Sequence, residues 1–260
     1  NAILANRVGM GTSGESYLVG QDKLMRSDSF LNAKDYSVTS SFLAGNTVDT
    51  KAVSEALNAT VGTDIMMDYN NNLVVSSWDH IEVSNGVRWG LISSVDVSEA
   101  LNPLLSNQTE FYASYIKKYG YYDLFLIGAN GHIFYTVTHE ADFNTNILDG
   151  VYSSSNLGDL IKQVKVSGKY GLVDFGPYAP SNGAPASFTA QPLLNKAGEP
   201  VLYLALQLPL EGINSIMGVR EGMGESGESY LVGQDLRMRS DSFLDAKGHN
   251  VQASFAGNVA

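Results

Sequence analysis

The sequence contains no cysteine, and its basic side chains are few. The absence of cysteine excludes disulfide scaffolds and thiolate metal sites. Only 16 Lys and Arg residues stand against 27 Asp and Glu residues, which gives a net charge of −11. This excess of negative charge repels phosphate backbones and anionic membrane surfaces, and the basic residues form no cluster, so nucleic acid is not expected as a partner. No apolar run approaches the roughly 20 residues that a membrane-spanning helix needs.

The composition is that of a folded protein. Hydrophobic residues make up 44% of the 260 positions and charged residues 17%, so the chain can bury a core. This length has room for one large domain or for two modules of about 100–150 residues. The chain starts at Asn1 without an initiator Met or a signal peptide, and we therefore expect a soluble part of a longer protein.

One segment occurs twice, 213 positions apart. Residues 1–42 and residues 214–255, called copy 1 and copy 2 below, are identical at 28 of 42 positions without a gap. The chain thus holds one full period and the beginning of the next. In each copy the sequence predicts a short helix, a glycine turn and a hairpin, whose strands in copy 1 cover residues 17–19 and 24–27.

The pattern after copy 1 predicts a module of mixed class. Residues 49–58 have helical spacing, and three β-prone runs follow it. Two strands, a helical layer and three strands is the order of a PAS-like fold, an α+β architecture of antiparallel sheets flanked by helices. The three predicted strands cover residues 64–69, 73–78 and 88–95.

A second module with the same order follows a predicted helix over residues 102–119. Asn102 can cap this helix, Pro103 suits its first turn and Gly120 can end it. We therefore expect four parts: a module at 1–98, a connecting helix at 99–119, a module at 120–213, and an incomplete module at 214–260. The elements predicted in the second module are strands at 122–127 and 132–137, a helix at 157–166, and strands at 172–175, 186–192 and 201–208.

Four runs carry a family resemblance. The runs YYDLFLIGANGHIFYTVTHEADFNTNIL, DFGPYAPSNGAPASFTAQPLL, LALQLPLEGINSIM and GMGESGESYLVGQDLRMRSDSF resemble the extracytoplasmic sensor region of bacterial methyl-accepting chemotaxis proteins and related sensor kinases. The resemblance implies a double Cache fold, in which two PAS-like modules lie on a long helix and the membrane-distal one holds a small ligand. It also implies a membrane-anchored parent in the inner membrane and a periplasmic or extracellular location. By this resemblance, residues 120–213 are the distal-type module, and modules opening with GESYLVG are proximal-type.

The order of modules departs from the family pattern. A single sensor would not contain two proximal-type starts, so either the parent has tandem double-Cache units or the arrangement of this chain is unusual. Copy 2 reaches Ala260 before its last three predicted strands. Because half of such a fold exposes a sheet edge, we expect residues 227–260 to be disordered or to be completed by another chain or segment, in a homodimer for example.

The best candidate for a ligand site lies in the distal-type module, where aromatic and hydrogen-bonding side chains gather beside a predicted central strand. The alternative is a rigid proline loop with an ordinary aromatic core. No arginine occurs between Arg88 and Arg220, so this module has no guanidinium to clamp a carboxylate. With Asp142, Asp174 and scattered lysines as its charged candidates, we expect a neutral or cationic ligand, or none. The predicted ligand-binding residues are Tyr135, Asp174, Tyr178, Ser181, Phe188 and Gln191.

Other motifs favour ordinary structure. The segments 9–14 and 222–227 fit GxGxxG, but a helix precedes and a strand follows, which is the reverse of a dinucleotide site, so a helix-to-strand joint is favoured. His139 and Glu140 with Asp142 are interpreted as a solvated strand end, since no catalytic set accompanies them. The histidines show no metal-ligand spacing, and neither a metal nor a cofactor is expected.

These patterns leave two function classes. The leading hypothesis is a sensor domain, without enzymatic activity, that binds a small molecule and signals to a membrane-anchored chemotaxis receptor or sensor kinase. The alternative is a structural or surface array of repeated modules without a small ligand, which the duplication and the acidic surface also fit.

Overall fold

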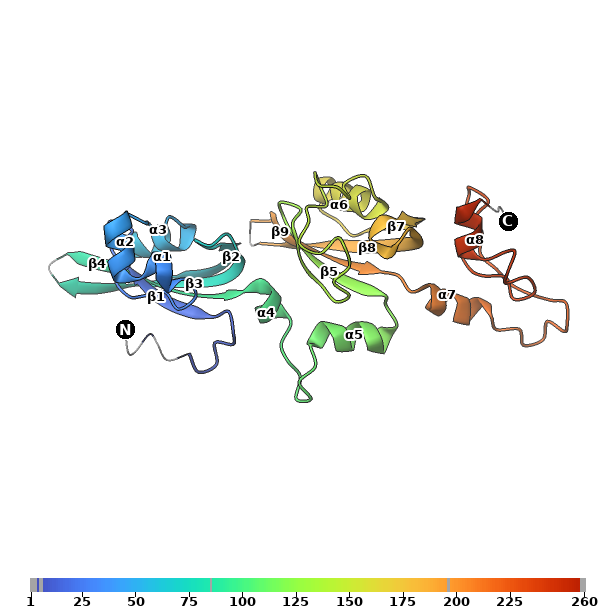
Figure 1. The fold of residues 1–260 in the computed structure, drawn as a ribbon, viewed down its shortest axis with the longest axis horizontal. Helices are drawn as coiled ribbons and strands as arrows, with labels where there is room; N and C mark the ends of the chain where they lie inside the picture. Colours follow the sequence, from blue (N-terminus) through green and yellow to red (C-terminus); the bar gives the residue numbers. More distant parts are fainter. Residues whose placement is uncertain (1–3, 5–6, 85, 196, 258–260) are drawn as a thin grey trace. The chain divides into compact units, whose positions relative to one another are not determined.

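The computed structural model of the chain describes residues 4, 7–84, 86–195 and 197–257. It divides into two compact units, Asn1–Pro103 and Leu104–Ala260. Each unit is built on one antiparallel sheet with helices against it, so the predicted α+β class is confirmed (Figure 1). Within the described residues, no helix has the length and apolar character needed to cross a membrane.

The sheet of unit 1 has the strand order β1-β4-β3-β2. The helix α3 packs on it, and its buried side chains Ala52, Val53 and Ala56 join Tyr17 and Ile92 in one core. A Thr50 cap, whose side chain accepts from the Val53 N–H at 3.3 Å, starts α3. The elements are β1 (Glu15–Val19), α1 (Ala33–Tyr36), α2 (Val38–Ala44), α3 (Lys51–Leu57), β2 (Gly62–Met67), β3 (Leu73–Ser84), β4 (Val87–Asp96) and α4 (Val97–Leu101).

The return strand predicted at residues 24–27 is wrong. Copy 1 has β1, but its second strand is reduced to one bridge between Val19 and Met25. The Met25 N–H donates to the Ser41 hydroxyl at 3.1 Å, so it is not available to a neighbouring strand. The Arg26 guanidinium also folds back onto both carboxylate oxygens of Asp22, at 2.9 and 2.8 Å. These local bonds replace a ladder.

Unit 2 has the complete PAS-like sheet, in the order β6-β5-β9-β8-β7. Its order of two strands, a helix and three strands is as predicted, and the bounds differ from the predicted ones by a few residues at most element ends. The first strand lies centrally beside the last, which is the arrangement of a PAS-like fold. The elements are α5 (Phe111–Tyr119), β5 (Asp123–Gly128), β6 (Ile133–Thr136), α6 (Asn156–Ser167), β7 (Gly171–Tyr178), η1 (Ala179–Ser181), β8 (Ala184–Leu194), β9 (Pro200–Gln207), α7 (Leu210–Met217) and α8 (Val251–Ala256).

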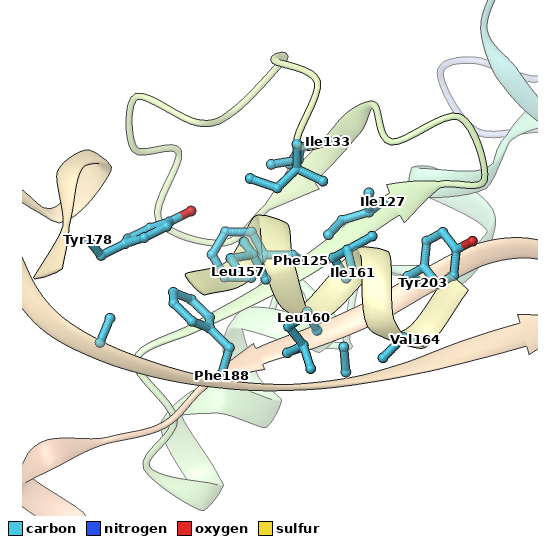
Figure 2. Packing of buried hydrophobic residues seen from close by; sticks show 14 residues of the cluster. Phe125, Ile127, Ile133, Leu157, Leu160, Ile161, Val164, Tyr178, Phe188 and Tyr203 are labelled. Carbon is cyan, nitrogen blue, oxygen red and sulfur yellow. The ribbon is translucent and has the colours of Figure 1, made fainter. Parts of the chain in front are cut away.

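The core of unit 2 lies between α6 and one face of the sheet. The helix begins at Ser155, whose hydroxyl accepts from the Gly158 N–H at 3.1 Å, and ends at Gly168 with φ 64°. Its apolar side points at the sheet, where Phe125 and Phe188 meet edge to face with ring centres 6.0 Å apart. Figure 2 shows this packing for Leu157, Leu160, Ile161 and Val164.

The helix predicted over residues 102–119 is wrong in its first half. Pro103 disfavours a helical backbone at Asn102, and α4 ends there. A turn follows in which the Asn107 side chain accepts from the N–H and the hydroxyl of Thr109, at 3.2 and 2.6 Å. The helix α5 starts only after Glu110 and ends at Gly120, as predicted.

The two copies share one local structure around an arginine. The Arg220 guanidinium donates to the carbonyl oxygens of Gly227, Gly224 and Glu225 at 2.8, 3.0 and 2.7 Å. Arg7 does the same for Gly14, Gly11 and Thr12 at 2.9, 3.2 and 2.8 Å. Both GxGxxG segments therefore turn carbonyl groups toward a cation, and in copy 1 the Thr12 and Ser13 N–H groups, which a phosphate would need, already donate to Glu99. The short helix predicted at the start of copy 1 falls mainly outside the described residues; in copy 2, α7 covers that position.

Copy 2 does not build the partial module that the sequence predicts. Residues 228–232 repeat the ESYLV of β1, yet the described residues of copy 2 contain no strand beyond the bridge between Val232 and Met238. For this segment, completion by another chain or segment stays a prediction. The segment keeps its local fold and packs against its own unit, where Met238 and Val251 are buried beside Phe175.

Candidate functional site: a buried acidic cluster in unit 2

Three carboxylates gather with polar side chains at one end of the unit 2 sheet. Asp123 comes from the start of β5, and Glu140 and Asp142 come from the loop that follows β6, while the η1 turn after β7 adds the Ser181 hydroxyl. The Asp123 and Asp142 side chains are fully buried, which is rare for carboxylates. We call this group the acidic cluster; its members are Tyr122, Asp123, Glu140, Asp142, Tyr178 and Ser181.

Asp123 holds the loop after β6 to the first residue of β5. Its carboxylate accepts from the backbone N–H groups of Leu124, Val137 and Thr138 at 2.7, 2.9 and 3.2 Å. The Thr138 hydroxyl also donates to it, at 2.5 Å. Burial raises the pKa of Asp123 to about 6, because desolvation outweighs the stabilisation that these four donors give to the charged form. Asp123 is a positioning residue whose hydrogen-bonding needs the protein meets.

Asp142 differs from Asp123 because half of its carboxylate is unsatisfied. One oxygen accepts from the Tyr178 hydroxyl. The other oxygen, Oδ1, is buried and has no hydrogen-bond partner among the described residues. Burial raises the pKa of Asp142, and the nearby Glu140 charge adds to the effect. A buried acceptor without a donor costs free energy, which marks this oxygen as a place where a ligand donor would be stabilising.

Glu140 ties two elements to the cluster. Its Oε1 accepts from the Tyr122 hydroxyl at 2.8 Å and its Oε2 from the Ser181 hydroxyl at 2.6 Å. The hydrogen bond to this carboxylate is the main cause that raises the pKa of Tyr122 to about 12. The η1 turn and the start of β5 are therefore both anchored on one charged group.

The cluster lacks a counter-charge in the described part of the chain. No lysine or arginine there forms an ion pair with Asp123, Glu140 or Asp142. Carboxylates that lie close together without a cation repel one another and favour the protonated form. The arrangement thus has the electrostatic character of a site for a cationic group.

The two predicted aromatic residues Tyr135 and Phe188 have different surroundings. The Tyr135 hydroxyl donates to Glu110 at 2.6 Å, and its ring lies 5.8 Å from that of Tyr112 on α5. Phe188 is fully buried and meets the Tyr178 ring edge to face, with centres 4.8 Å apart (Figure 2). Of the predicted residues, the structure therefore brings Tyr178, Ser181 and Phe188 together and places Tyr135 on the β6 side.

Asp174 and Gln191 lie apart from this group. Asp174 is exposed on β7 and accepts from the Arg239 Nε and NH2 groups at 2.7 and 2.8 Å. This guanidinium lowers the pKa of Asp174. Gln191 is exposed between two buried residues of β8, so its side chain faces away from the core that holds Phe188.

The sequence indicates Asp142 as a charged candidate of the site but assigns no ligand-binding role to Asp123 or Glu140. The interpretation of residues 139–142 as a solvated strand end is wrong for Asp142, which is 0% exposed. Asp123 falls inside the strand predicted at residues 122–127. The available signal was the density of acidic residues in a stretch that no basic residue accompanies, from Asp123 through Glu140 to Asp142.

Comparisons with known proteins give structural similarity alone. No family model matches the chain, and no curated protein matches it. Among solved structures, an extracellular ligand-binding receptor from Desulfohalobium retbaense matches at 11% identity and a TM-score of 0.43, over 80% of this chain and 32% of that one. The ligand-binding domain of the Campylobacter jejuni chemoreceptor Tlp3, in complex with L-valine, matches at 13% and 0.43, over 81% and 72%. That of the Pseudomonas fluorescens chemoreceptor CtaA, in complex with L-isoleucine, matches at 16% and 0.35, over 55% and 54%.

Proposed function

We propose that unit 2 is an extracytoplasmic sensor domain that binds a small ligand through a cationic group, such as a protonated amine, at the acidic cluster. This proposal depends on Oδ1 of Asp142, a buried oxygen that accepts no hydrogen bond and lies near other carboxylates without a positively charged partner. An ammonium group donating to this oxygen forms a charge-assisted hydrogen bond and relieves the repulsion between Asp142 and Glu140. The sequence resemblance to chemoreceptor sensor regions supports the sensing role.

The surrounding side chains limit what the ligand can be. Unit 2 contributes no arginine from residues 104–213, so a ligand carboxylate has no guanidinium there to bind bidentately. The rings of Tyr135, His139 and Phe143 follow one another beside the cluster, with centres 6.2 and 4.6 Å apart. Aromatic faces attract cations and pack against apolar groups. A small amine with an apolar body satisfies both features.

The same contacts give a route from ligand to helix. Tyr135 bonds Glu110, the residue that precedes α5, and Tyr112 of that helix packs on the Tyr135 ring. A ligand beside Tyr135 changes the position of α5 only if it binds two arrangements of this contact with different affinity. The proposed output is such a bias on α5, passed to a membrane-anchored chemotaxis receptor or sensor kinase.

A thermal-shift screen followed by calorimetry tests the proposal. Small amines at saturating concentration should raise the melting temperature, because a ligand that binds only the folded state stabilises it. Asp142→Asn should abolish this rise. Asp174→Asn, which removes a carboxylate of unit 2 outside the cluster, is the matched control and should keep it. Tight binding of a dicarboxylate, or an amine response that survives in Asp142→Asn, would refute the proposal.

The duplication favours a second candidate, a structural array of repeated modules. Copy 2 packs on its own unit through Met238 and Arg239, as a spacer between successive modules would. The complete gene separates the two candidates. Membrane-spanning helices and a signalling domain would support sensing, whereas many further 213-residue periods would support the array.

A further inference from the structure

Copy 2 forms no strand in its described residues, but the equivalent segment of copy 1 is a strand that pairs with β4 of unit 1. Residues 15–19 and 228–232 are both ESYLV. In copy 1 this segment is β1, and it pairs with β4 in the register Ser16↔Ser93 and Tyr17↔Ile92. The surface of β4 that receives copy 1 is therefore complementary, residue by residue, to a segment that the chain carries a second time.

Copy 2 leaves the core residues of this segment in solvent. Tyr17 and Val19 of copy 1 are 1% and 0% exposed, whereas Tyr230 and Val232 of copy 2 are 49% and 41% exposed. Exposed apolar side chains on an unpaired extended segment favour pairing with another sheet edge. Because residues 228–232 are identical to β1, the sheet edge that fits them best is β4, the strand with which β1 pairs.

The local frame that presents the segment is already formed in copy 2. In copy 1 the Ser27 hydroxyl accepts from the Leu18 N–H at 2.9 Å, and Ser240 does the same for Leu231 at 2.9 Å. The pair Ser29–Glu15 recurs as Ser242–Glu228, each at 2.9 Å. Copy 2 therefore reaches a new host without refolding, which lowers the entropic cost of pairing.

We propose that copy 2 of one chain takes the place of copy 1 beside β4 of a second copy of this chain. The exchange replaces one ESYLV strand by another, so it reproduces the backbone hydrogen bonds to β4 and the burial that Tyr17 and Val19 have. Because the donor segment and the receiving edge belong to different units, successive exchanges join chains head to tail. This interaction is independent of the sensing function.

The contacts of copy 2 with β7 compete with its pairing beside β4. Met238 is buried beside Phe175, and Arg239 pairs with Asp174. The corresponding Met25 lies in the core of unit 1. One methionine cannot occupy both environments, so docking on β7 and substitution beside β4 exclude each other.

One difference between the copies favours copy 1 within a single chain. Lys23 pairs with Asp49, and Leu236 stands in its place in copy 2. Copy 1 is also tethered to its own unit, whereas copy 2 arrives from another molecule. Exchange therefore increases with protein concentration.

Engineered cysteines test the exchange, since the chain has none of its own. Ser16 and Ser93 are register partners whose hydroxyls lie 3.0 Å apart, and a Ser16→Cys/Ser93→Cys chain measures how readily a disulfide closes at this place. One full-length chain with Ser229→Cys is then mixed with another that carries Ser93→Cys, under mild oxidation. We expect a disulfide-linked heterodimer whose share rises with concentration. A tenfold excess of cysteine-free chain should lower that share about tenfold by competition.

The controls define what would overturn the proposal. Asp174→Asn in the donor chain should raise the heterodimer yield, because it weakens the docked state. Homodimers of the Ser229→Cys chain alone, at the heterodimer level, would place copy 2 against copy 2 and contradict the proposal. So would a mixture that stays monomeric under conditions in which the Ser16→Cys/Ser93→Cys chain closes its own disulfide.

Discussion

Replacing Asp123 by Asn should change how the stability of unit 2 depends on pH. The Asn side chain keeps an oxygen for the N–H groups of Leu124, Val137 and Thr138, and its amide can donate to the Thr138 hydroxyl. The substitution therefore preserves the geometry and removes the titration. What it eliminates is the cost of holding a buried charge.

The magnitude follows from the pKa. Burial raises the pKa of Asp123 from 3.8 to about 6, which corresponds to about 3 kcal/mol at 25 °C. Because the folded state binds the proton more tightly than the unfolded chain, the stabilising contribution is complete below pH 3.8 and is lost as the pH rises through 6. Above that pH the wild-type protein carries the full cost of the buried carboxylate, and the variant carries none.

Urea unfolding followed by circular dichroism between pH 4 and 7 measures the effect. The unfolding free energy of Asp123→Asn minus that of the wild type should grow by about 2.4 kcal/mol across this range, which is most of the full effect. Trp78 and Trp89 are the two tryptophans of the chain, and both lie in unit 1, so their fluorescence transition serves as an internal control and should not change. A free-energy difference that is constant with pH would show that Asp123 is already hydrated or neutralised, and would refute the reasoning.

Three further predictions concern other carboxylates and their partners. Glu99 accepts hydrogen bonds from the turn before β1, which lowers its pKa to about 2. Its stabilising effect is therefore present above pH 4.5 and is lost as the pH falls through 2. Glu99→Gln should weaken the dependence of the stability of unit 1 on pH in acid, measured by tryptophan fluorescence. Tyr178→Phe keeps the ring packing but removes the donor to Asp142, and should lower the unfolding free energy of unit 2 by about 1–3 kcal/mol in urea titrations; an unchanged value would mean that water already serves this carboxylate. Asp174→Asn should speed hydrogen exchange in residues 238–256 severalfold and leave exchange in α6 unchanged, because the partly exposed Arg239–Asp174 ion pair contributes up to about 1 kcal/mol. Equal exchange in both proteins would show that apolar contacts alone hold copy 2 on β7.

The sequence predicts the fold of unit 2 well because its signals are local. Short, continuous apolar runs on either side of the turn at Ala129, Asn130 and Gly131 mark β5 and β6, and a serine cap and a terminal glycine bound α6. The predicted connecting helix failed where two local signals compete. Its apolar period continues past Pro103, but that proline and the Asn107 turn interrupt the backbone.

The site was harder to predict because burial of a carboxylate is a tertiary property. Nothing in the residues around Asp142 shows that Tyr178, 36 positions later, will cover it. Asp174 is the opposite case. Its neighbours Phe175 and Tyr178 are buried, yet Asp174 is exposed, at a register shift of β7 between Val173 and Gly176. There it forms an ion pair with Arg239 of copy 2.

The arginine-centred loop that both copies share has a consequence for the order of events during synthesis. Its bonds join residues four to seven positions apart, and the serine bond that frames ESYLV spans nine, so this frame closes within microseconds of leaving the ribosome. The contact of β1 with β4 spans 77 positions and has to wait for several seconds of translation. During that interval copy 1 of a nascent chain presents the same bare strand that copy 2 presents in the finished protein. Nascent chains on one messenger are therefore open to capturing each other, and the close spacing of ribosomes becomes a factor in how this chain assembles.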